Sequence, residues 1–322
     1  MSKTIVIGVL VATLCFVAIP ATAAPLQKSV IGPGADWVVH ADLEAFRNST
    51  IGKLVLGELK ARGIEDKMQE FAMVFSFNPL TDVRNVTLYG KGRDPSRIVV
   101  IGDGQFDAER LVSLVRMNPQ FQETPYQGVT LYQWHNEDKK GGPGQLMYGF
   151  VREGRGVVIS TGLDALKQAA DNLRGAGPGP SASLASQVPS GDSGTFLQVA
   201  ATGIGNLAGD DPKAAILKQA EMLTARAGEA KERLSVELSL RAQSPDMADK
   251  VMKVVVGLLA LPELAAPEQP KLSELAKSVN VTRDDKVVQA RFETSSQSIF
   301  AFLKEQWQKK QQQPQTPQGT QP

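Results

Sequence analysis

Residues 234–242 read Leu-Ser-Val-Glu-Leu-Ser-Leu-Arg-Ala, so that apolar and polar side chains alternate along the segment. The side chains of a β-strand point alternately to its two faces, and this pattern therefore places the leucines and the valine on one face. The serines, Glu237 and Arg241 share the other face. A strand of this kind is typical of an antiparallel sheet with one packed face and one face in water. The segment predicts that such a sheet forms part of the fold.

The elements expected around this strand fall into two halves of similar order. In the first half we expect strands at 36–42, 85–89, 97–101, 129–134, 145–151 and 157–160, and helices at 43–62, 107–118 and 163–173. In the second half we expect strands at 194–200, 234–242, 279–282 and 286–292, and helices at 212–227, 245–261 and 296–307. The matching segments are 35–45 with 195–204, 106–115 with 246–258, and 145–173 with 279–303. Few residues are identical across this match, so it indicates either an internal duplication or a coincidence among common elements.

These elements predict an α+β fold of two similar halves, each a mostly antiparallel sheet covered on one side by helices. Residues 175–193 are rich in Gly, Pro and Ser, which indicates a linker between a first half at 24–174 and a second half at 194–307. Residues 308–322 are mostly Gln, Pro and Thr with no large apolar side chain, and we expect a disordered tail there.

Two further segments stand out for their hydrophobicity. They are the runs at 71–77 and 251–261, the most hydrophobic segments of the mature chain. An exposed apolar patch of that size usually binds a partner or a lipid. Burial in the core is the more ordinary explanation, and we expect it for both runs.

The N-terminus has the layout of a secretory signal peptide. Lys3 precedes an apolar run at residues 5–19, and Ala21 and Ala23 provide the small side chains of an Ala-x-Ala cleavage site. The run is shorter than the roughly 20 residues that span a bilayer, which favours cleavage over an uncleaved anchor. The sequence therefore predicts a signal peptide at 1–23 and export to the periplasm or the extracellular space as a soluble protein.

Composition narrows the partners and the chemistry. The single cysteine, Cys15, lies in the signal, so the mature chain has no disulfide, thiolate metal site or cysteine nucleophile. Of the 35 basic residues Lys3 also lies in the signal, which leaves 34 basic against 34 acidic residues. This balance argues against nucleic acid or an anionic membrane surface as the main partner, because both need a basic surface. After the signal we expect no membrane span, and no cofactor is predicted.

The candidates for catalysis or metal binding are the two histidines and one neighbouring carboxylate. His40 and Asp42 are two residues apart on an expected strand, so their side chains share a face. If His135 reaches them, the three form a mixed metal site or an acid–base pair, with further carboxylates nearby. Those carboxylates are Glu44, Glu137 and Asp138.

Ordinary structural roles compete with this chemistry. His40 fits a hydrogen-bonded residue on a half-buried sheet, and His135 begins a polar loop. The common hydrolase signatures are absent. The Gly-Asp-Gly turn at 102–104 lacks the third glycine of a dinucleotide fingerprint, so we interpret it as a strand-to-helix turn rather than an anion site.

Four segments carry a resemblance to other proteins. They read Asp-Trp-Val-Val-His-Ala-Asp at 36–42, Leu-Tyr-Gly at 88–90, Phe-Asp-Ala-Glu-Arg-Leu at 106–111 and Tyr-Gln-Gly-Val-Thr-Leu-Tyr at 126–132. In this order they resemble a group of uncharacterised exported bacterial proteins, over most of the first half and more faintly over the second. The resemblance implies a location in the bacterial envelope. It implies no activity, because these residues are turns and core positions.

Two functional hypotheses follow. The first is an exported, non-catalytic binding or scaffolding protein of the cell envelope, whose sheet face or cleft receives a protein or a small ligand. The alternative is a periplasmic hydrolase or metal-dependent enzyme that uses His40, Asp42 and His135. A third possibility is a structural protein held through its C-terminal tail. The oligomeric state is left open.

Overall fold

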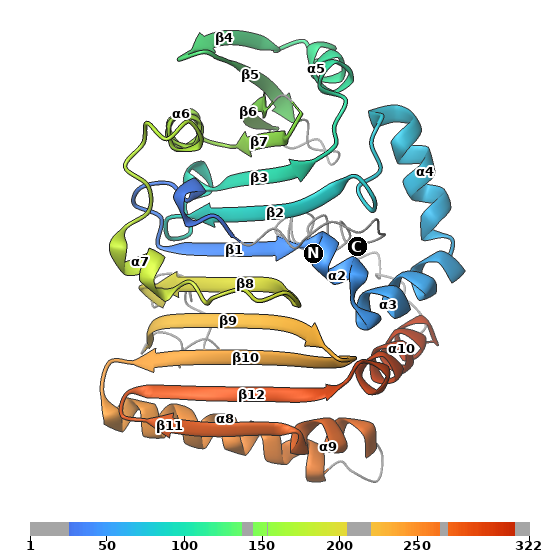
Figure 1. Cartoon of the computed structure of the whole chain (residues 1–322), viewed down its shortest axis with the longest axis vertical. Helices are drawn as coiled ribbons and strands as arrows, with labels where there is room; N and C mark the ends of the chain where they lie inside the picture. Colours follow the sequence, from blue (N-terminus) through green and yellow to red (C-terminus); the bar gives the residue numbers. More distant parts are fainter. Residues whose placement is uncertain (1–25, 137–143, 153, 205–219, 265–269, 313–322) are drawn as a thin grey trace, which may run out of the picture.

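The structure is a computed structural model, and it describes residues 26–136, 144–152, 154–204, 220–264 and 270–312. The predicted signal peptide at 1–23 and the loop residues Glu137 and Asp138 lie outside these ranges. Within them the chain forms one twelve-stranded sheet with the order β11-β12-β10-β9-β8-β1-β2-β3-β7-β6-β5-β4 (Figure 1). The strands are β1 (Trp37–Asp42), β2 (Val83–Gly90), β3 (Val99–Gly104), β4 (Gln122–Tyr126), β5 (Val129–Asn136), β6 (Gln145–Arg152), β7 (Gly156–Ser160), β8 (Thr195–Thr202), β9 (Ala220–Ala230), β10 (Arg233–Ala242), β11 (Val279–Asp284) and β12 (Val287–Ser295).

Helices connect these strands and pack on both faces and at one end of the sheet (Figure 1). They are η1 (Lys28–Val30), α2 (Leu43–Asn48), α3 (Thr50–Ala61), α4 (Ile64–Phe75), η2 (Pro95–Arg97), α5 (Ala108–Arg116), α6 (Leu163–Leu173), α7 (Ala182–Gln187), α8 (Pro245–Leu264), α9 (Pro270–Lys277) and α10 (Ser296–Gln312). The combination of helices with an antiparallel sheet confirms the predicted α+β class.

The two halves repeat the same topology about the centre of the sheet. β1 and β8 are antiparallel neighbours there, with Val39 opposite Val199. Outward from them the order is β1-β2-β3-β7-β6 on one side and β8-β9-β10-β12-β11 on the other. In chain order α5 then corresponds to α8, and α6 to α10. These pairs are the ones that the sequence match predicted, and β4 and β5 are an addition in the first half. An identical five-strand order with the same crossover favours duplication over coincidence.

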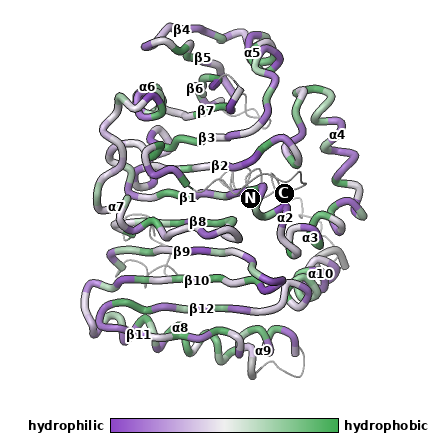
Figure 2. The backbone as a smooth tube through the Cα atoms, viewed as in Figure 1, coloured by the Kyte–Doolittle hydropathy of each residue, from purple (hydrophilic) through white to green (hydrophobic). Residues whose placement is uncertain are grey.

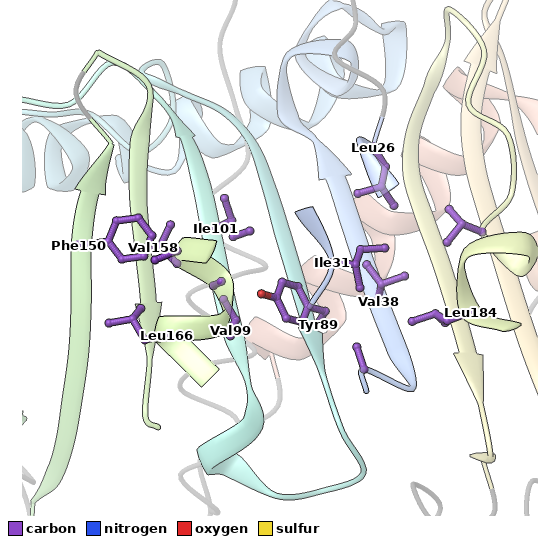
Figure 3. Close-up of a cluster of buried hydrophobic side chains, with 14 of the residues drawn as sticks. Leu26, Ile31, Val38, Tyr89, Val99, Ile101, Phe150, Val158, Leu166 and Leu184 are labelled. Atoms are coloured by element: carbon purple, nitrogen blue, oxygen red, sulfur yellow. The ribbon is translucent and has the colours of Figure 1, made fainter. Parts of the chain in front are cut away.

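The core of the first half lies on one face of the sheet. Val38 pairs with Tyr89 and with Ala200, and Tyr89 pairs with Val99, so these side chains share that face. η1, α6 and α7 cover them, and Leu166 of α6 is fully buried among them (Figure 3).

The core of the second half lies on the opposite face. Trp37 is next to Val38 on β1, so its side chain points to the other face. Trp37 pairs with Ala201 on β8, Ala201 pairs with Leu223 on β9, and Leu223 pairs with Leu240 on β10, so these side chains share that face. Leu240 packs against a cluster that contains Val251 of α8. The two halves therefore share one sheet but place their main helices on opposite faces, which composition and periodicity did not reveal.

The run at 251–261 is only partly core, contrary to the expectation. Val251 is 3% exposed, but Leu258 and Leu261 on the same helix are 59% and 57% exposed. Figure 2 shows that hydrophobic residues continue along α8. Because α8 lies on the last strands, only one of its sides meets the sheet. In the described part of the chain no helix is both long and apolar enough to cross a membrane.

The run at 71–77 is likewise only partly core. It covers the end of α4 and the two residues after it, and Met73 on α4 is 77% exposed. Phe71, Phe75 and Phe77 contact each other as a small aromatic cluster, and Phe77 extends it to Phe106. The rings are half-buried, and Phe77 and Phe106 pack against a buried cluster of the sheet that consists of Leu43, Val83 and Val86.

The predicted linker is a packed part of the body. Residues 182–187 form α7, and Leu184 on this helix is fully buried against β8 and the first-half core. The first residues of the predicted disordered tail at 308–322 are helical, because α10 continues to Gln312. Residues 313–322 lie outside the described ranges.

The last helix is held against the first half by charge and by stacking. The Glu58 carboxylate on α3 accepts hydrogen bonds from Lys304 on α10 and from Arg62, each at 2.8 Å. These hydrogen bonds, the one from Lys304 first, hold the pKa of Glu58 below its ordinary value. The Arg62 guanidinium lies 5.1 Å from the centre of the Trp307 ring. Trp307 therefore anchors α10 on α3.

Replacing Trp307 with Ala is expected to lower the free energy of unfolding by about 1 kcal/mol, because the cation–π contact with Arg62 is lost. Trp307→Phe is the control, since it keeps an aromatic face under the guanidinium and should lose less. Urea unfolding followed by circular dichroism measures both. Equal losses in the two variants would contradict a role for the ring face.

Candidate ligand-binding site

His40 and Asp42 share a face of β1, as predicted, and both are buried. The His40 Nδ1 atom is 2.9 Å from the Thr87 hydroxyl on β2. The Asp42 carboxylate accepts a hydrogen bond from the Ala45 backbone N–H at 2.8 Å and so caps α2. Both residues make contacts that hold β1, β2 and α2 together.

Glu44 and Arg47 on α2 extend this buried polar cluster. Arg47 is 2% exposed and donates from Nη1 to the backbone carbonyl oxygens of Val83 at 2.6 Å and Leu80 at 3.3 Å. Glu44 is 5% exposed. Buried charged groups need hydrogen-bond partners, and the positions of those partners determine how the helix packs on the sheet.

His135 does not join this cluster. It lies on β5, and the sheet order places five strand-to-strand steps between β1 and β5. At ~4.8 Å for each step this is about 24 Å along the sheet. The backbone of His135 is instead bonded to the Asn118 side chain, which donates to the His135 carbonyl at 2.7 Å. Among the described residues no group of three or more His, Cys, Asp or Glu side chains is arranged to hold a metal ion.

A cavity of about 440 Å³ lies beside the first turn of α6. Its walls are the loop at 32–35 before β1, the turn between β2 and β3, and residues 162–168. Its volume is within the range of sites for small molecules. Three segments that are far apart in the sequence meet there, and the paired strands β1, β2, β3 and β7 hold them in place.

Glycines make room for this cavity. A side chain at Gly32 would place its Cβ atom 2.7 Å from the Tyr89 ring, and one at Gly162 would collide with the Ser96 backbone. Gly34 has φ +73°, a conformation that other residues rarely adopt. The loop can therefore approach Tyr89 on β2, and the start of α6 can approach η2, only because Gly32 and Gly162 have no side chain.

Tyr89 supplies an unusual polar group to the cavity wall. The residue is 4% exposed, and its hydroxyl is a buried polar atom without a hydrogen-bond partner among the described residues. Burial raises the pKa of this hydroxyl well above its ordinary value. In Figure 3 the hydroxyl points away from Ile31, toward the side where Val99 and Leu166 lie. A buried hydroxyl without a partner costs about 1–3 kcal/mol. The hydroxyl atom has almost no accessible surface, so it lies in the core behind the cavity wall.

Charged groups lie at the same cavity. Lys91 and Arg97 line it from the turn between β2 and β3, and Asp164 lines it from α6. Arg97 lies 3.8 Å from Asp94, a loose and exposed contact. The N-cap residue of α6, Gly162, provides no side-chain cap to the helix.

A second hollow of about 760 Å³ lies between α5, α6 and the strands β5 and β6. It is rich in arginine, but three of the four arginines are already in ion pairs at 2.6 Å. The pairs are Arg116–Glu123, Arg152–Asp103 and Arg174–Asp171. Since these carboxylates neutralise the arginines, the cavity at α6 is the better candidate for a ligand.

Sequence reasoning did not find this cavity. The segments that form two of its walls, Gly-Pro-Gly at 32–34 and Gly-Lys-Gly at 90–92, have the composition of ordinary turns, and Tyr89 ends an expected strand. The only local feature of the sequence at this cavity is a tyrosine at the end of a strand, followed by Gly-Lys-Gly. This feature does not predict a cavity by itself, because α6, which forms another wall, lies more than seventy residues later in the chain.

Comparisons with known proteins establish the fold only. A scan against models of protein families finds no match, and a search of curated proteins finds no similar sequence. Among solved structures, crystal form III of TP0453 is similar, with a TM-score of 0.50, 10% identity, and coverage of 89% of this chain and 100% of that chain. Crystal form IV of TP0453 has a TM-score of 0.46 at 10% identity, with 88% and 97% coverage. The match to crystal form III therefore shows a similar fold in a protein of very different sequence.

Proposed function

We propose that this protein is an exported, non-catalytic binding protein of the bacterial cell envelope, and that its ligand is a small molecule bound in the cavity at α6. The observation that supports it best is the cavity itself, whose volume of about 440 Å³ suits a small molecule. Its walls combine charged side chains, Lys91, Arg97 and Asp164, with apolar ones such as Leu163, a lining that is typical of ligand sites.

The sequence supports the location. The signal-like segment at 1–23 and a single cysteine within that segment fit a protein that functions outside the cytoplasm without disulfides. The resemblance to uncharacterised exported bacterial proteins points the same way.

The positions of the histidines favour binding over catalysis. An enzyme that uses His40, Asp42 and His135 needs these three side chains around one substrate. His40 and Asp42 are buried in contacts that hold β1 to its neighbours, and His135 lies five strands away. Neither histidine lines the cavity at α6.

Replacing Tyr89 with Phe is expected to stabilise the protein. The ligand-free variant should be more stable than the wild type by about 1 kcal/mol, because the buried hydroxyl without a partner among the described residues is removed and the ring stays. Thermal unfolding of the two ligand-free proteins measures this difference. A loss of stability in the ligand-free variant would show that the hydroxyl has a partner in the protein.

The ligand itself can be sought in the protein as the organism makes it. We would purify the protein and a Gln168→Trp variant, in which the larger side chain would fill the cavity, from the cell envelope and compare them by native mass spectrometry. A small molecule that is retained by the wild type and depleted in the variant is the expected result. A reproducible protein partner with no small molecule would favour scaffolding instead. If both forms carry neither, the proposal is wrong.

A further inference from the structure

The sheet has two edge strands, and they differ in how well they are protected. β4 at one end contains Pro125, and its Glu123 pairs with Arg116 at 2.6 Å. Proline and charged side chains hinder the pairing of an edge strand with another chain. β11 at the other end has no proline, and its residues 279–282 are uncharged and rich in β-branched side chains. The outer side of β11 pairs with no strand in the described part of the chain.

We infer that this edge is an interaction surface for a second copy of the same chain, and that the two β11 strands pair antiparallel about a twofold axis at Val281. A copy of the chain fits because an edge strand that pairs antiparallel with itself satisfies both edges at once. The inference is independent of the proposed function, since the edge lies in the second half and the ligand cavity in the first.

The two faces of the sheet restrict the register of this pairing. Val281 packs against the buried cluster under α8, and Arg283 reaches Asp249 on that helix at 2.8 Å. The odd-numbered residues of β11 therefore face α8, whereas Asn280 and Thr282 face the other side. Directly opposite residues of an antiparallel pair share a face, so odd-numbered residues must lie opposite odd-numbered ones.

Charge then selects the register centred on Val281. In this register Val281 lies opposite its own copy, and Asn280 lies opposite the partner's Thr282. Beyond the paired residues, Asp285 lies opposite the partner's Lys277 at the end of α9, and the twofold axis repeats this contact. Both side chains are exposed, and neither is in an ion pair with another described residue. A register shifted by two residues in either direction loses both contacts.

The outer side of α8 adds an apolar contact. Figure 1 shows that α8 runs along β11 at this end of the sheet. Val256 lies two helical turns after Asp249, so it is on the side of α8 that reaches Arg283 of β11. The Val256 side chain is 47% exposed.

The symmetry brings the two copies of α8 together. A twofold axis perpendicular to the sheet keeps both helices on the same face. Each α8 lies over its own outer strands, so the two helix axes would be about 10 Å apart, close to the usual distance between packed helices. Val256 then faces the partner's helix, and one arrangement covers both the free strand edge and this exposed side chain.

The strand pairing is tested by changing the charges that lie opposite each other. Asn280→Lys with Thr282→Lys places lysines opposite lysines, whereas Asn280→Asp with Thr282→Lys places opposite charges together. Both double variants alter the same two exposed positions, so the second one controls for folding. Sedimentation velocity over a wide range of protein concentration measures the monomer–dimer equilibrium. We expect the wild type to dimerise, the lysine variant to dimerise about tenfold more weakly, and the aspartate–lysine variant to retain the dimer.

Val256→Glu tests the helix contact, and Val254→Glu is its matched control. The two valines are 47% and 46% exposed on one helix, but residues two apart point to different sides of it. Val256→Glu should weaken the dimer about tenfold or more, because a charge enters an apolar contact. Val254→Glu should leave the dimer unchanged.

A cross-link locates the axis. Cys15 is the single cysteine of the chain, so Cys15→Ser with Val281→Cys leaves one thiol in each copy. Directly opposite residues have Cβ atoms about 5 Å apart, which is close to disulfide geometry. Oxidation should therefore convert this variant into a covalent dimer, whereas Cys15→Ser with Val254→Cys should stay uncross-linked.

Three results overturn the inference. The first is a wild type that stays monomeric at every concentration. The second is a dimer of equal strength in the two double variants, which would show that β11 does not pair with its copy. The third is a dimeric Val281→Cys protein that forms no cross-link, which would place the axis elsewhere.

Discussion

Replacing Glu229 with Gln lowers the free energy of unfolding by about 2–3 kcal/mol, because it breaks charge-assisted hydrogen bonds that join the two halves. The Glu229 carboxylate on β9 accepts from the backbone N–H groups of Thr50 at 2.6 Å and Ile51 at 2.8 Å. It also accepts from the Ser296 hydroxyl at 2.5 Å. One carboxylate thus serves the first turn of α3 and the first residue of α10. A glutamine at this position keeps one accepting oxygen, but its NH₂ group replaces the other oxygen and faces a hydrogen-bond donor.

The contribution of Glu229 depends on pH. Burial alone would raise its pKa, but the hydrogen bonds from Ser296, Ile51 and Thr50 outweigh burial and hold the pKa of this carboxyl below its ordinary value. A carboxyl with a lower pKa in the folded state stabilises the protein above its unfolded pKa, near 4.3, and loses this contribution as the pH falls through the folded value. The difference between wild type and Glu229→Gln should therefore be full at pH 7 and shrink below roughly pH 4.

Glu293→Gln is the matched control for this variant. Glu293 pairs with Arg233 at 2.5 Å, but both side chains are more than half exposed. Such a surface pair contributes roughly 0–1 kcal/mol. Chemical denaturation at pH 7 and at pH 3.5 measures both variants. Equal losses for the two variants, or a Glu229→Gln loss that grows at low pH, would contradict the role assigned to Glu229.

Leu166→Ala should be among the most destabilising changes in the first half, with a loss of about 3–4 kcal/mol in the free energy of unfolding. Leu166 lies in the middle of α6 and is fully buried in the cluster that contains Val99 and Val158 (Figure 3). Its removal leaves a cavity in a close-packed interior, because sheet and helix cannot both move to fill it.

Leu258→Ala tests the same chemical change on a helix face that no described element covers. Leu258 is 59% exposed on α8, so its truncation should change the stability by less than about 0.5 kcal/mol. Urea unfolding curves with equal slopes would show that each change acts on stability rather than on compactness. If Leu258→Ala costs as much as Leu166→Ala, the outer side of α8 is covered in solution.

Much of the fold follows from local pattern. The alternation of apolar and polar residues at 234–242 predicted β10, and the helix predicted at 163–173 has the bounds of α6. The matching segments of the two halves predicted the repeated topology. These features depend on residues that are close in sequence, where the period of the apolar side chains decides the element. The C-terminal ends of α8 and α10 were predicted several residues too early. Pro262 is typical of a helix end although α8 continues to Leu264, and the polar residues at 308–312 carry no apolar periodicity.

One segment that was predicted to be a helix forms a strand. Residues 212–227 were expected to be helical, but Ala220–Ala230 form β9, and 205–219 lie outside the described residues. The segment Ala-Glu-Met-Leu-Thr-Ala-Arg-Ala at 220–227 is rich in good helix formers. Pairing with β8 on one side and β10 on the other gives it two full ladders of hydrogen bonds. That tertiary gain outweighs the weak local preference.

The sequence by itself determined which segments are strands and helices over most of the chain, the repeat of the two halves, and the signal-like start. It also placed His40 and Asp42 on one face of a strand, because side chains two residues apart on a strand share a face. The tertiary structure alone decided that the main helices of the halves lie on opposite faces, that His135 stays far from His40, and that Tyr89 meets Gly32 and the start of α6. These contacts join residues that are far apart in the chain. They depend on strand order and on how helices pack, which local periodicity does not encode.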